Sequence, residues 1–211
     1  QGLYEGVDVG NGQEGLITYM RTDSTRLSND FIYAARDRIE QEYGKEYLGY
    51  YHAKNDANAQ DAHEAIRPTS IANTPEKIKD HLTNEQYRLY KMIYCRALAS
   101  LMAPAKFNSV AVTLSQNGYD FTANGSTLTF DGYLKVYKAY DTSKDVVLPV
   151  LNESEQLVAT LLEKNQHFTE PPARYTEAKL IKDLEEEGIG RPSTYAMIIE
   201  TIQMRGYVTL E

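Results

Sequence analysis

The sequence predicts an α+β protein built from three consecutive pieces. Capped helical periodicity dominates residues 1–104, which we predict to form a mainly helical domain. Alternating apolar residues between glycine-containing turns follow in residues 105–168, which predicts an antiparallel β region. Two helical runs in residues 169–211 predict a C-terminal helical region of helix-turn-helix character.

Glycine and polar residues mark the less regular stretches of the first piece. Residues 1–14 contain several glycines and predict a short helix followed by a flexible loop. Residues 16–21 are apolar and then polar, which predicts a strand or an extended segment. Residues 47–60 are polar and predict a loop.

Side-chain caps predict the helices of the first piece. Ser28 can cap a helix from Asn29 to about Tyr43 that stops at Gly44. Thr74 followed by Pro75 predicts another helix start, with proline at the first helical position. The expected inner face of the Ser28 helix is Phe31, Ile32, Ala35 and Ile39.

The strongest helical signal lies between residues 83 and 104. Thr83 and Gln86 form a capping box, and Pro104 is expected to end the helix. Cys95 lies in this run and is expected to be buried filler. Its apolar positions are Tyr87, Tyr90, Ile93, Tyr94, Ala97, Leu98 and Leu101.

The second piece reads as consecutive hairpins. Apolar and polar residues alternate beyond Lys106, and Gly118, Asn124-Gly125 and Asp131-Gly132 separate short β-rich runs. We therefore expect antiparallel sheet over residues 106 to about 140, followed by a loop at 141–144.

Two prolines, Pro171 and Pro172, predict a linker before the third piece. Thr176 is expected to cap a helix that ends at Gly188. Ser193 is expected to cap a second helix that ends before Gly206.

The overall composition limits the classes of protein. With 42% hydrophobic residues the chain can form a core, and one cysteine excludes an internal disulfide and a cysteine-cluster zinc site. A net charge of −8 argues against a protein that coats duplex DNA, although a local cationic channel is still allowed. A single cysteine suits a reducing cytosol, so we expect a cytoplasmic protein. No apolar run approaches the roughly 20 residues that span a bilayer, so we expect no membrane partner.

Residues 15–25 (GLITYMRTDST) concentrate groups suited to phosphate chemistry. The phenol of Tyr19 is a poor nucleophile at neutral pH, because its ordinary pKa is about 10, unless cations hold the phenolate and the phosphate that it attacks. Arg21 can supply such a cation, since residues i and i+2 of an extended segment share a side and a guanidinium can hold two phosphate oxygens. Asp23 could be a base, a metal ligand or, as we favour, a local structural residue such as a turn cap for Thr25 and Arg26.

This segment resembles the active-site tyrosine segment of type IA DNA topoisomerases. Residues 62–68 (AHEAIRP), 171–178 (PPARYTEA) and 188–195 (GIGRPSTY) match the same family in the same order. The chain lacks an initial methionine and most resembles a central part of the bacterial members. The resemblance implies an enzyme in which Tyr19 cleaves single-stranded DNA as a 5′-phosphotyrosine and rejoins it, which relaxes negative supercoils.

The resemblance also implies roles for other residues. Arg21 and His63 would stabilise the phosphate charge, as an imidazolium or guanidinium can. Arg67 could contact DNA, or it could pair locally with Glu64. The remaining expected DNA-binding residues are Thr18, Arg174, Arg191, Ser193 and Thr194, of which Ser193 also serves as an ordinary helix cap.

Two further expectations come from the family. Its arch-like domain favours a strand over residues 156–163, with a short helix as the alternative. Family members also carry an acidic Toprim domain, usually with an Asp-x-Asp pair, which this chain lacks. We therefore expect Mg²⁺ to bind the intact parent through that absent domain, and not this chain.

Other functional readings are open for the chain as it stands. Alone, it could be a catalytically inert fragment that binds single-stranded DNA or acts as a scaffold, and we favour this reading for the isolated piece because the acidic domain is absent. A helix-turn-helix regulator that binds duplex DNA is disfavoured by the net charge of −8.

Overall fold

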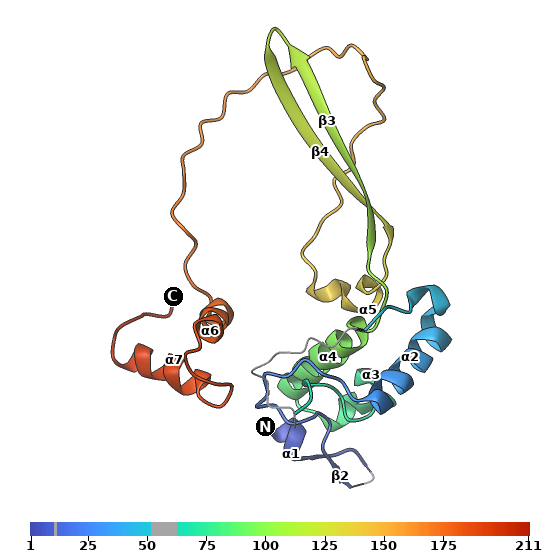
Figure 1. Ribbon diagram of the computed structural model, residues 1–211, viewed down its shortest axis with the longest axis vertical. Helices are drawn as coiled ribbons and strands as arrows, with labels where there is room; N and C mark the ends of the chain where they lie inside the picture. The colour runs from blue at the N-terminus through green and yellow to red at the C-terminus, as the bar shows by residue number, and fades with distance from the viewer. Residues whose placement is uncertain (11, 52–62) are drawn as a thin grey trace. The chain divides into compact units, whose positions relative to one another are not determined.

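The computed structural model describes residues 1–10, 12–51 and 63–211, so most of the loop expected at 47–60 lies outside the described residues. These residues form seven α-helices and two antiparallel two-stranded sheets, which confirms the α+β class (Figure 1). The chain divides into two compact units, Gln1–Pro149 and Val150–Glu211, and each is described by itself. The division into three pieces stays a prediction.

The chain begins with a short helix that turns back on the segment after it. Helix α1 (Gly2–Glu5) precedes a small hairpin, β1 (Val7–Asp8) and β2 (Gln13–Glu14), where the sequence predicted a flexible loop. The amide of Leu16 then donates to the carbonyl of Leu3 at 2.7 Å. This bond holds α1 against the residues that follow the hairpin.

Three helices of the first unit start at the predicted caps. The hydroxyl of Ser28 accepts from the amide of Phe31 to open α2 (Asn29–Tyr43), and Gly44 closes it. Thr74 caps α3 (Pro75–Ile78). The capping box of Thr83 and Gln86 opens α4 (Asn84–Ala99). Short 3₁₀ turns are η1 (Lys45–Tyr47), η2 (Lys79–His81) and η3 (Lys138–Tyr140).

These helices bury one hydrophobic core. Helix α4 ends at Ala99, before Pro104, and the residues after it fold into the core. The hydroxyl of the fully buried Tyr90 donates to the carbonyl of Asn73 at 2.6 Å, so a polar atom inside the core is satisfied. The core residues are Leu3, Leu16, Ile17, Leu27, Phe31, Ala35, Ile39, Ile78, Tyr90, Tyr94, Ala97, Leu98, Leu101 and Met102.

A single long hairpin replaces the predicted series of hairpins (Figure 1). Strands β3 (Lys106–Gln116) and β4 (Tyr119–Phe130) pair along their whole length and turn at Asn117 and Gly118, both with positive φ. The expected turn at Asn124-Gly125 is wrong, because Gly125 pairs with Val110 in mid-strand. The sheet ends at Phe130, and helix α5 (Leu134–Tyr137) occupies residues expected to be strand.

Gly125 has a tertiary role in place of the predicted turn. A Cβ at this position would lie 3.0 Å from the carbonyl oxygen of Val146 and 2.8 Å from a side-chain carbon of Leu148. Val146 pairs with Ser126 through two backbone hydrogen bonds. The glycine therefore lets a third length of chain cross the hairpin closely.

The hairpin joins the helical core through a compact junction. The amide of Ala103 donates to the carbonyl of Tyr47 at 2.7 Å, and the carbonyl of Ala103 accepts from Tyr133. The hydroxyl of Tyr47 donates to Asp131 at 2.7 Å, and this hydrogen bond lowers the pKa of Asp131. Gly132 has φ +49° here, and its missing Cβ would lie 2.4 Å from the carbonyl oxygen of Ala103.

The second unit consists of an irregular segment followed by two helices. Residues 156–163 form neither the predicted strand nor the alternative helix, and Leu161 and Leu162 are exposed, without a partner strand in the described part of this unit. Helix α6 (Glu177–Glu186) starts at Thr176 as predicted. Helix α7 (Tyr195–Met204) has Thr194 as its N-cap residue, so the prediction of Ser193 as its cap is wrong.

The turn before α7 explains that shift by one residue. The hydroxyl of Thr194 accepts from the amide of Arg191 at 2.9 Å and donates to its carbonyl at 3.1 Å. The amide of Tyr195 also bonds the carbonyl of Arg191. Thr194 thus closes the turn, while Ser193 stays exposed within it.

Replacing Gly132 by alanine should destabilise the junction more than the same change at Gly118. Both glycines have positive φ, which costs an alanine about 1–2 kcal/mol, but only Gly132 lacks space for a Cβ. We expect Gly132→Ala to lower the free energy of unfolding by at least about 1 kcal/mol more than Gly118→Ala in urea titrations. Equal losses would contradict the crowding at the junction.

Candidate active site

The segment that carries Tyr19 is pinned to the segment that carries His63. Ile17 pairs with Pro68 as an antiparallel bridge, and the amide of Thr18 donates to the carbonyl of Arg67 at 2.9 Å. The hydroxyl of Thr18 donates to the carbonyl of Ala65 at 2.7 Å and accepts from the amide of Arg67 at 3.0 Å. The expected extended geometry therefore holds at Ile17, and the chain bends at Thr18, one residue before the tyrosine.

A third segment joins the other two through Arg67 and Glu64. The carboxylate of Glu64 accepts from the amide of Ser28 at 3.2 Å and pairs with the Nε of Arg67 at 2.8 Å. Arg67 also donates to the carbonyl of Pro68 and the hydroxyl of Ser28, and its guanidinium lies 4.8 Å from the centroid of the Phe31 ring. The structure thus shows the local pairing, one of the two roles left open for Arg67, and the DNA contact stays a prediction.

The charges of this cluster alter the acidity of Glu64. Burial alone would raise the pKa of its carboxyl. The hydrogen bond and charge of Arg67, together with the amide of Ser28 and the charge of Arg26, outweigh burial and hold that pKa below its usual value. Glu64 is therefore ionised at neutral pH and acts as the acceptor that joins the segments.

The ring of Tyr19 contacts two other rings. Its centroid is 5.4 Å from that of Tyr4, edge to face at 66°, and 5.3 Å from that of His63, tilted at 48°. The ring is half-buried, and its hydroxyl bonds no residue that the structure describes. The structure thus brings together two residues that the sequence singled out, Tyr19 and His63.

Tyr4 is the member of this cluster that the sequence did not reveal. It is one of 17 tyrosines, and no motif marks it. It reaches Tyr19 because α1 folds back on the segment after the hairpin, where Gly15 lies against the carbonyl of Tyr4. That approach depends on tertiary structure, so no local signal could have identified it.

The other polar residues of the tyrosine segment are placed differently. Arg21 is exposed and has no hydrogen bond or ion pair within the described ranges, and the chain bends at Met20 and Arg21 instead of running straight. The expected turn-capping role of Asp23 is filled by others, because Thr22 accepts from the amide of Ser24 and Ser24 from the amide of Arg26.

The remaining predicted DNA-binding residues lie in the second unit. Arg191 is exposed and donates to the carbonyl of Gly190 at 2.7 Å, next to the exposed Ser193 and the turn-closing Thr194. Arg174 is exposed and forms a long ion pair of 3.8 Å with Glu211. Their positions relative to Tyr19 are not described.

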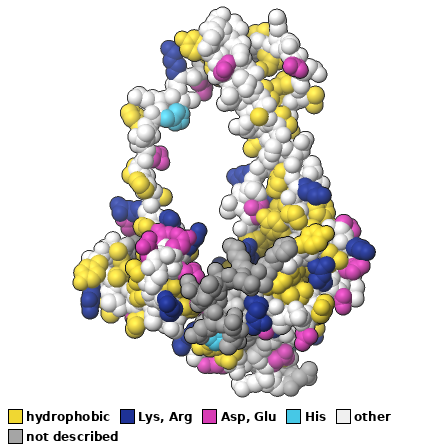
Figure 2. Space-filling view, viewed as in Figure 1, with side chains coloured by type: hydrophobic (Ala, Val, Ile, Leu, Met, Phe, Trp, Pro, Cys, Tyr) yellow, Lys and Arg dark blue, Asp and Glu magenta, His cyan; other side chains and the backbone are white. Residues whose placement is uncertain are grey.

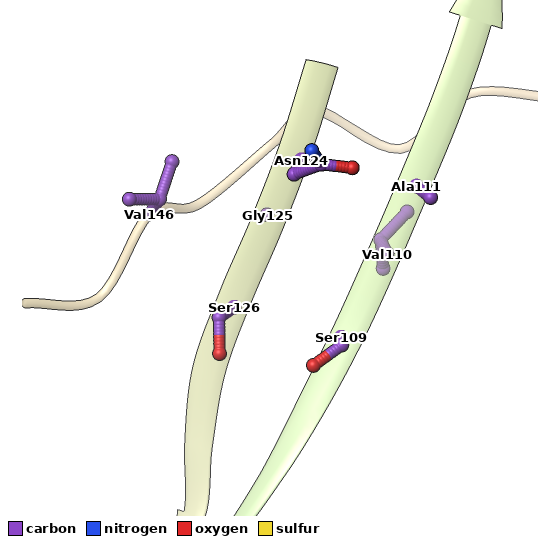
Figure 3. Close-up of a pocket in the computed structure, with 7 residues that line it drawn as sticks. All are labelled: Ser109, Val110, Ala111, Asn124, Gly125, Ser126 and Val146. Carbon is purple, nitrogen blue, oxygen red and sulfur yellow. The ribbon is translucent and has the colours of Figure 1, made fainter. Parts of the chain in front are cut away.

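Metal-binding groups and pockets are the other features of the described residues that bear on a site. Within residues 1–10, 12–51 and 63–211, no three His, Cys, Asp or Glu side chains are grouped to hold a metal ion, so these residues do not fit Mg²⁺. A pocket of about 330 Å³ lies on the hairpin beside Gly125 and Val146 (Figure 3). No charged side chain lines it, so it does not suit phosphate chemistry. No described helix is long and apolar enough to cross a membrane.

Comparison with known proteins gives the class of protein. A family model described as DNA topoisomerase matches residues 1–211, so the chain belongs to this family, and its motifs are those of type IA. The structure of full-length topoisomerase I from Thermotoga maritima is similar, with a TM-score of 0.80 and 37% sequence identity. The match covers 99% of this chain and 34% of that chain.

The contact between Glu64 and Arg67 predicts a pH-dependent stability. A lowered pKa stabilises the fold above the usual glutamate pKa of about 4.3, and this contribution is lost as pH falls through the lowered value. We expect Glu64→Gln to reduce the free energy of unfolding by about 1–3 kcal/mol near neutral pH, with a smaller difference in acid.

The control for this change is Glu76→Gln. Glu76 also forms an ion pair, with Lys91, but its side chain is 68% exposed, and such pairs contribute at most about 1 kcal/mol. Urea titrations at several pH values measure both variants. A Glu64→Gln effect that does not change with pH would contradict the assignment.

Proposed function

We propose that this chain is the active-site tyrosine part of a type IA DNA topoisomerase that cleaves and rejoins single-stranded DNA to relax negative supercoils. Membership of the family supports this proposal. The observation that carries it is the placement of Tyr19, whose ring is held beside His63 while its hydroxyl bonds no described residue. A nucleophile must be both positioned and available, and Tyr19 meets both conditions.

The proposed reaction exchanges one phosphate ester for another. The Tyr19 oxygen attacks a backbone phosphorus, the phenol loses its proton, and the bond from phosphorus to the 3′ oxygen breaks. The 3′ oxygen takes up a proton and leaves as a hydroxyl. The phosphate at the 5′ end of the other fragment stays bonded to the tyrosine oxygen. After another strand has passed, the 3′ hydroxyl reverses the attack, so no ATP is consumed.

Two cationic groups support this chemistry in the proposal. An imidazolium at His63 can donate to a phosphate oxygen near the ring of Tyr19, which lies 5.3 Å away by centroids. Arg21 is exposed and has no ion pair among the described residues, so its guanidinium is available to two phosphate oxygens. Both would stabilise negative charge that develops during the attack.

The proposed strand-binding residues come from both units. Arg191 and Thr194 form the turn that opens α7, where free amides and the positive helix end attract phosphate, with Ser193 beside them. Further proposed DNA contacts are Thr18, Arg67 and Arg174. Thr18 and Arg67 use most of their polar atoms within the protein, so we expect their contribution to DNA binding to be the smaller one.

The intact enzyme would need parts beyond this chain. The chain spans about a third of the length of the similar Thermotoga maritima enzyme, so we propose the other domains of the parent as its partners. We also propose that Mg²⁺ binds there, in an acidic Toprim domain, and that the three predicted pieces belong to separate domains of the parent. A DNA substrate would place the parent in the cytoplasm.

A second candidate function applies to the isolated chain. Because the described residues offer no group of acidic side chains for a metal ion, we propose that the piece alone binds single-stranded DNA or acts as a scaffold without cleaving. Incubation with an oligonucleotide and Mg²⁺, followed by denaturing electrophoresis, tests this. A covalent adduct on the isolated chain would overturn the proposal that it is inert.

Tyr19→Phe should abolish cleavage in the full-length parent enzyme. Phenylalanine keeps the ring contacts with Tyr4 and His63 but removes the attacking oxygen. We expect no covalent adduct with single-stranded DNA and unchanged non-covalent affinity, measured by electrophoresis and by fluorescence anisotropy. An adduct in this variant would refute Tyr19 as the nucleophile.

Arg21→Ala should lower the cleavage rate, whereas Arg67→Ala should lower the stability of the fold. Arg21 has no partner among the described residues, so its loss should slow cleavage by about a hundredfold while stability changes by less than about 0.5 kcal/mol. Loss of Arg67 leaves Glu64 without its charged partner and should cost about 1–3 kcal/mol of stability. Single-turnover cleavage and urea titration on the same samples measure both quantities. A large stability loss in Arg21→Ala would show a structural role instead.

A further inference from the structure

Tyr4 contacts the proposed nucleophile but has no part in the chemistry described so far. Its ring meets that of Tyr19 edge to face, with centroids 5.4 Å apart and planes at 66°. Aromatic pairs prefer this arrangement, because the positive edge of one ring faces the negative face of the other. The contact therefore has a defined geometry as well as a hydrophobic component.

The backbone around Tyr4 is also fixed by contacts with the segment that leads to Tyr19. Leu3 is buried in the core, and its carbonyl accepts from the amide of Leu16 at 2.7 Å. A Cβ on Gly15 would lie 2.7 Å from the carbonyl oxygen of Tyr4, so only glycine permits this approach. Helix α1 is thus attached to the start of the segment that ends in Tyr19.

Tyr4 and His63 together limit where the Tyr19 ring can lie. The two rings contact Tyr19 at centroid distances of 5.4 and 5.3 Å, while its hydroxyl is left without a bond to any described residue. Such packing restricts rotation about the side-chain bonds of Tyr19 without blocking its oxygen. Attack on phosphorus needs this kind of restriction, because a misplacement of about 1 Å can lower a rate by a hundredfold.

We propose that Tyr4 is a positioning residue for Tyr19, which holds the phenol ring in the orientation required for attack on the DNA phosphate. The proposal rests on the proposed function of Tyr19. It assigns no proton transfer and no DNA contact to Tyr4, because the ring of Tyr4 acts through its contact with the ring of Tyr19. The hydroxyl of Tyr4 is therefore dispensable, whereas its ring is not.

The test compares Tyr4→Ala with Tyr4→Phe in the full-length parent enzyme. Tyr4→Ala should slow single-turnover cleavage of a single-stranded oligonucleotide by about tenfold, the equivalent of about 1.4 kcal/mol. Tyr4→Phe should stay within about twofold of the wild type, because it keeps the ring. Non-covalent affinity, measured in a Tyr19→Phe background, should not change in either variant.

Tyr33→Ala is the matched control. Tyr33 lies on α2, is 66% exposed and has no ring contact among the described residues, so its loss should alter neither the cleavage rate nor the affinity. Thermal unfolding of each variant separates a loss of stability from a loss of position. If Tyr4→Ala does not fold, Tyr4→Leu keeps much of the hydrophobic volume and removes the aromatic ring, and it should show the same slow cleavage.

Each outcome decides between clear alternatives. Weaker DNA binding by Tyr4→Ala with a normal rate at saturation would make Tyr4 a DNA contact and overturn the proposal. An unchanged rate in Tyr4→Ala, or a rate that Tyr4→Phe fails to restore, would also overturn it. Cleavage by Tyr19→Phe would instead refute the proposed function, so the two failures are distinguishable.

Discussion

The whole arrangement depends on the pairing of residues 16–18 with residues 65–69. An antiparallel bridge between Ile17 and Pro68 joins two segments that are far apart in the sequence. The hydroxyl of Thr18 strengthens it, because it donates one hydrogen bond to the second segment and accepts another from it. Ile17 is buried in the core, so apolar packing also stabilises the pairing. Without it, Tyr19 and His63 would belong to independent loops.

Local signals predicted the helices well because the physics of a helix start is local. Ser28, Thr83 and Thr176 each accept a hydrogen bond from the amide three residues further on, as their sequence contexts indicated. Gly125 shows the limit of such reasoning. The Asn124-Gly125 pair is typical of a turn, but the missing Cβ of Gly125 makes room for the backbone of Val146. Only the folded chain shows this contact.

The site shows the same division between local and tertiary information. The motif at residues 15–25 identified Tyr19 and the motif at residues 62–68 identified His63. The structure brings their rings together, but their chemical roles remain proposals. Tyr4 could not be predicted, because its contact results from the return of α1. The hairpin presents exposed apolar side chains (Figure 2), and no sequence pattern says what covers them: Phe107, Val110, Leu114 and Phe121.

The Thr18 amide is the last one before Tyr19 to take part in a backbone hydrogen bond within the described chain. The next main-chain partners come at Ser24, through a side chain. Tyr19 therefore lies at a boundary in backbone hydrogen bonding, because the described chain shows no backbone–backbone hydrogen bond at residues 19–23. We expect the amides after Thr18 to exchange faster than that of Thr18. A side chain at such a boundary is attached to hydrogen-bonded backbone on one side and to less constrained backbone on the other, which would suit the nucleophile proposed above.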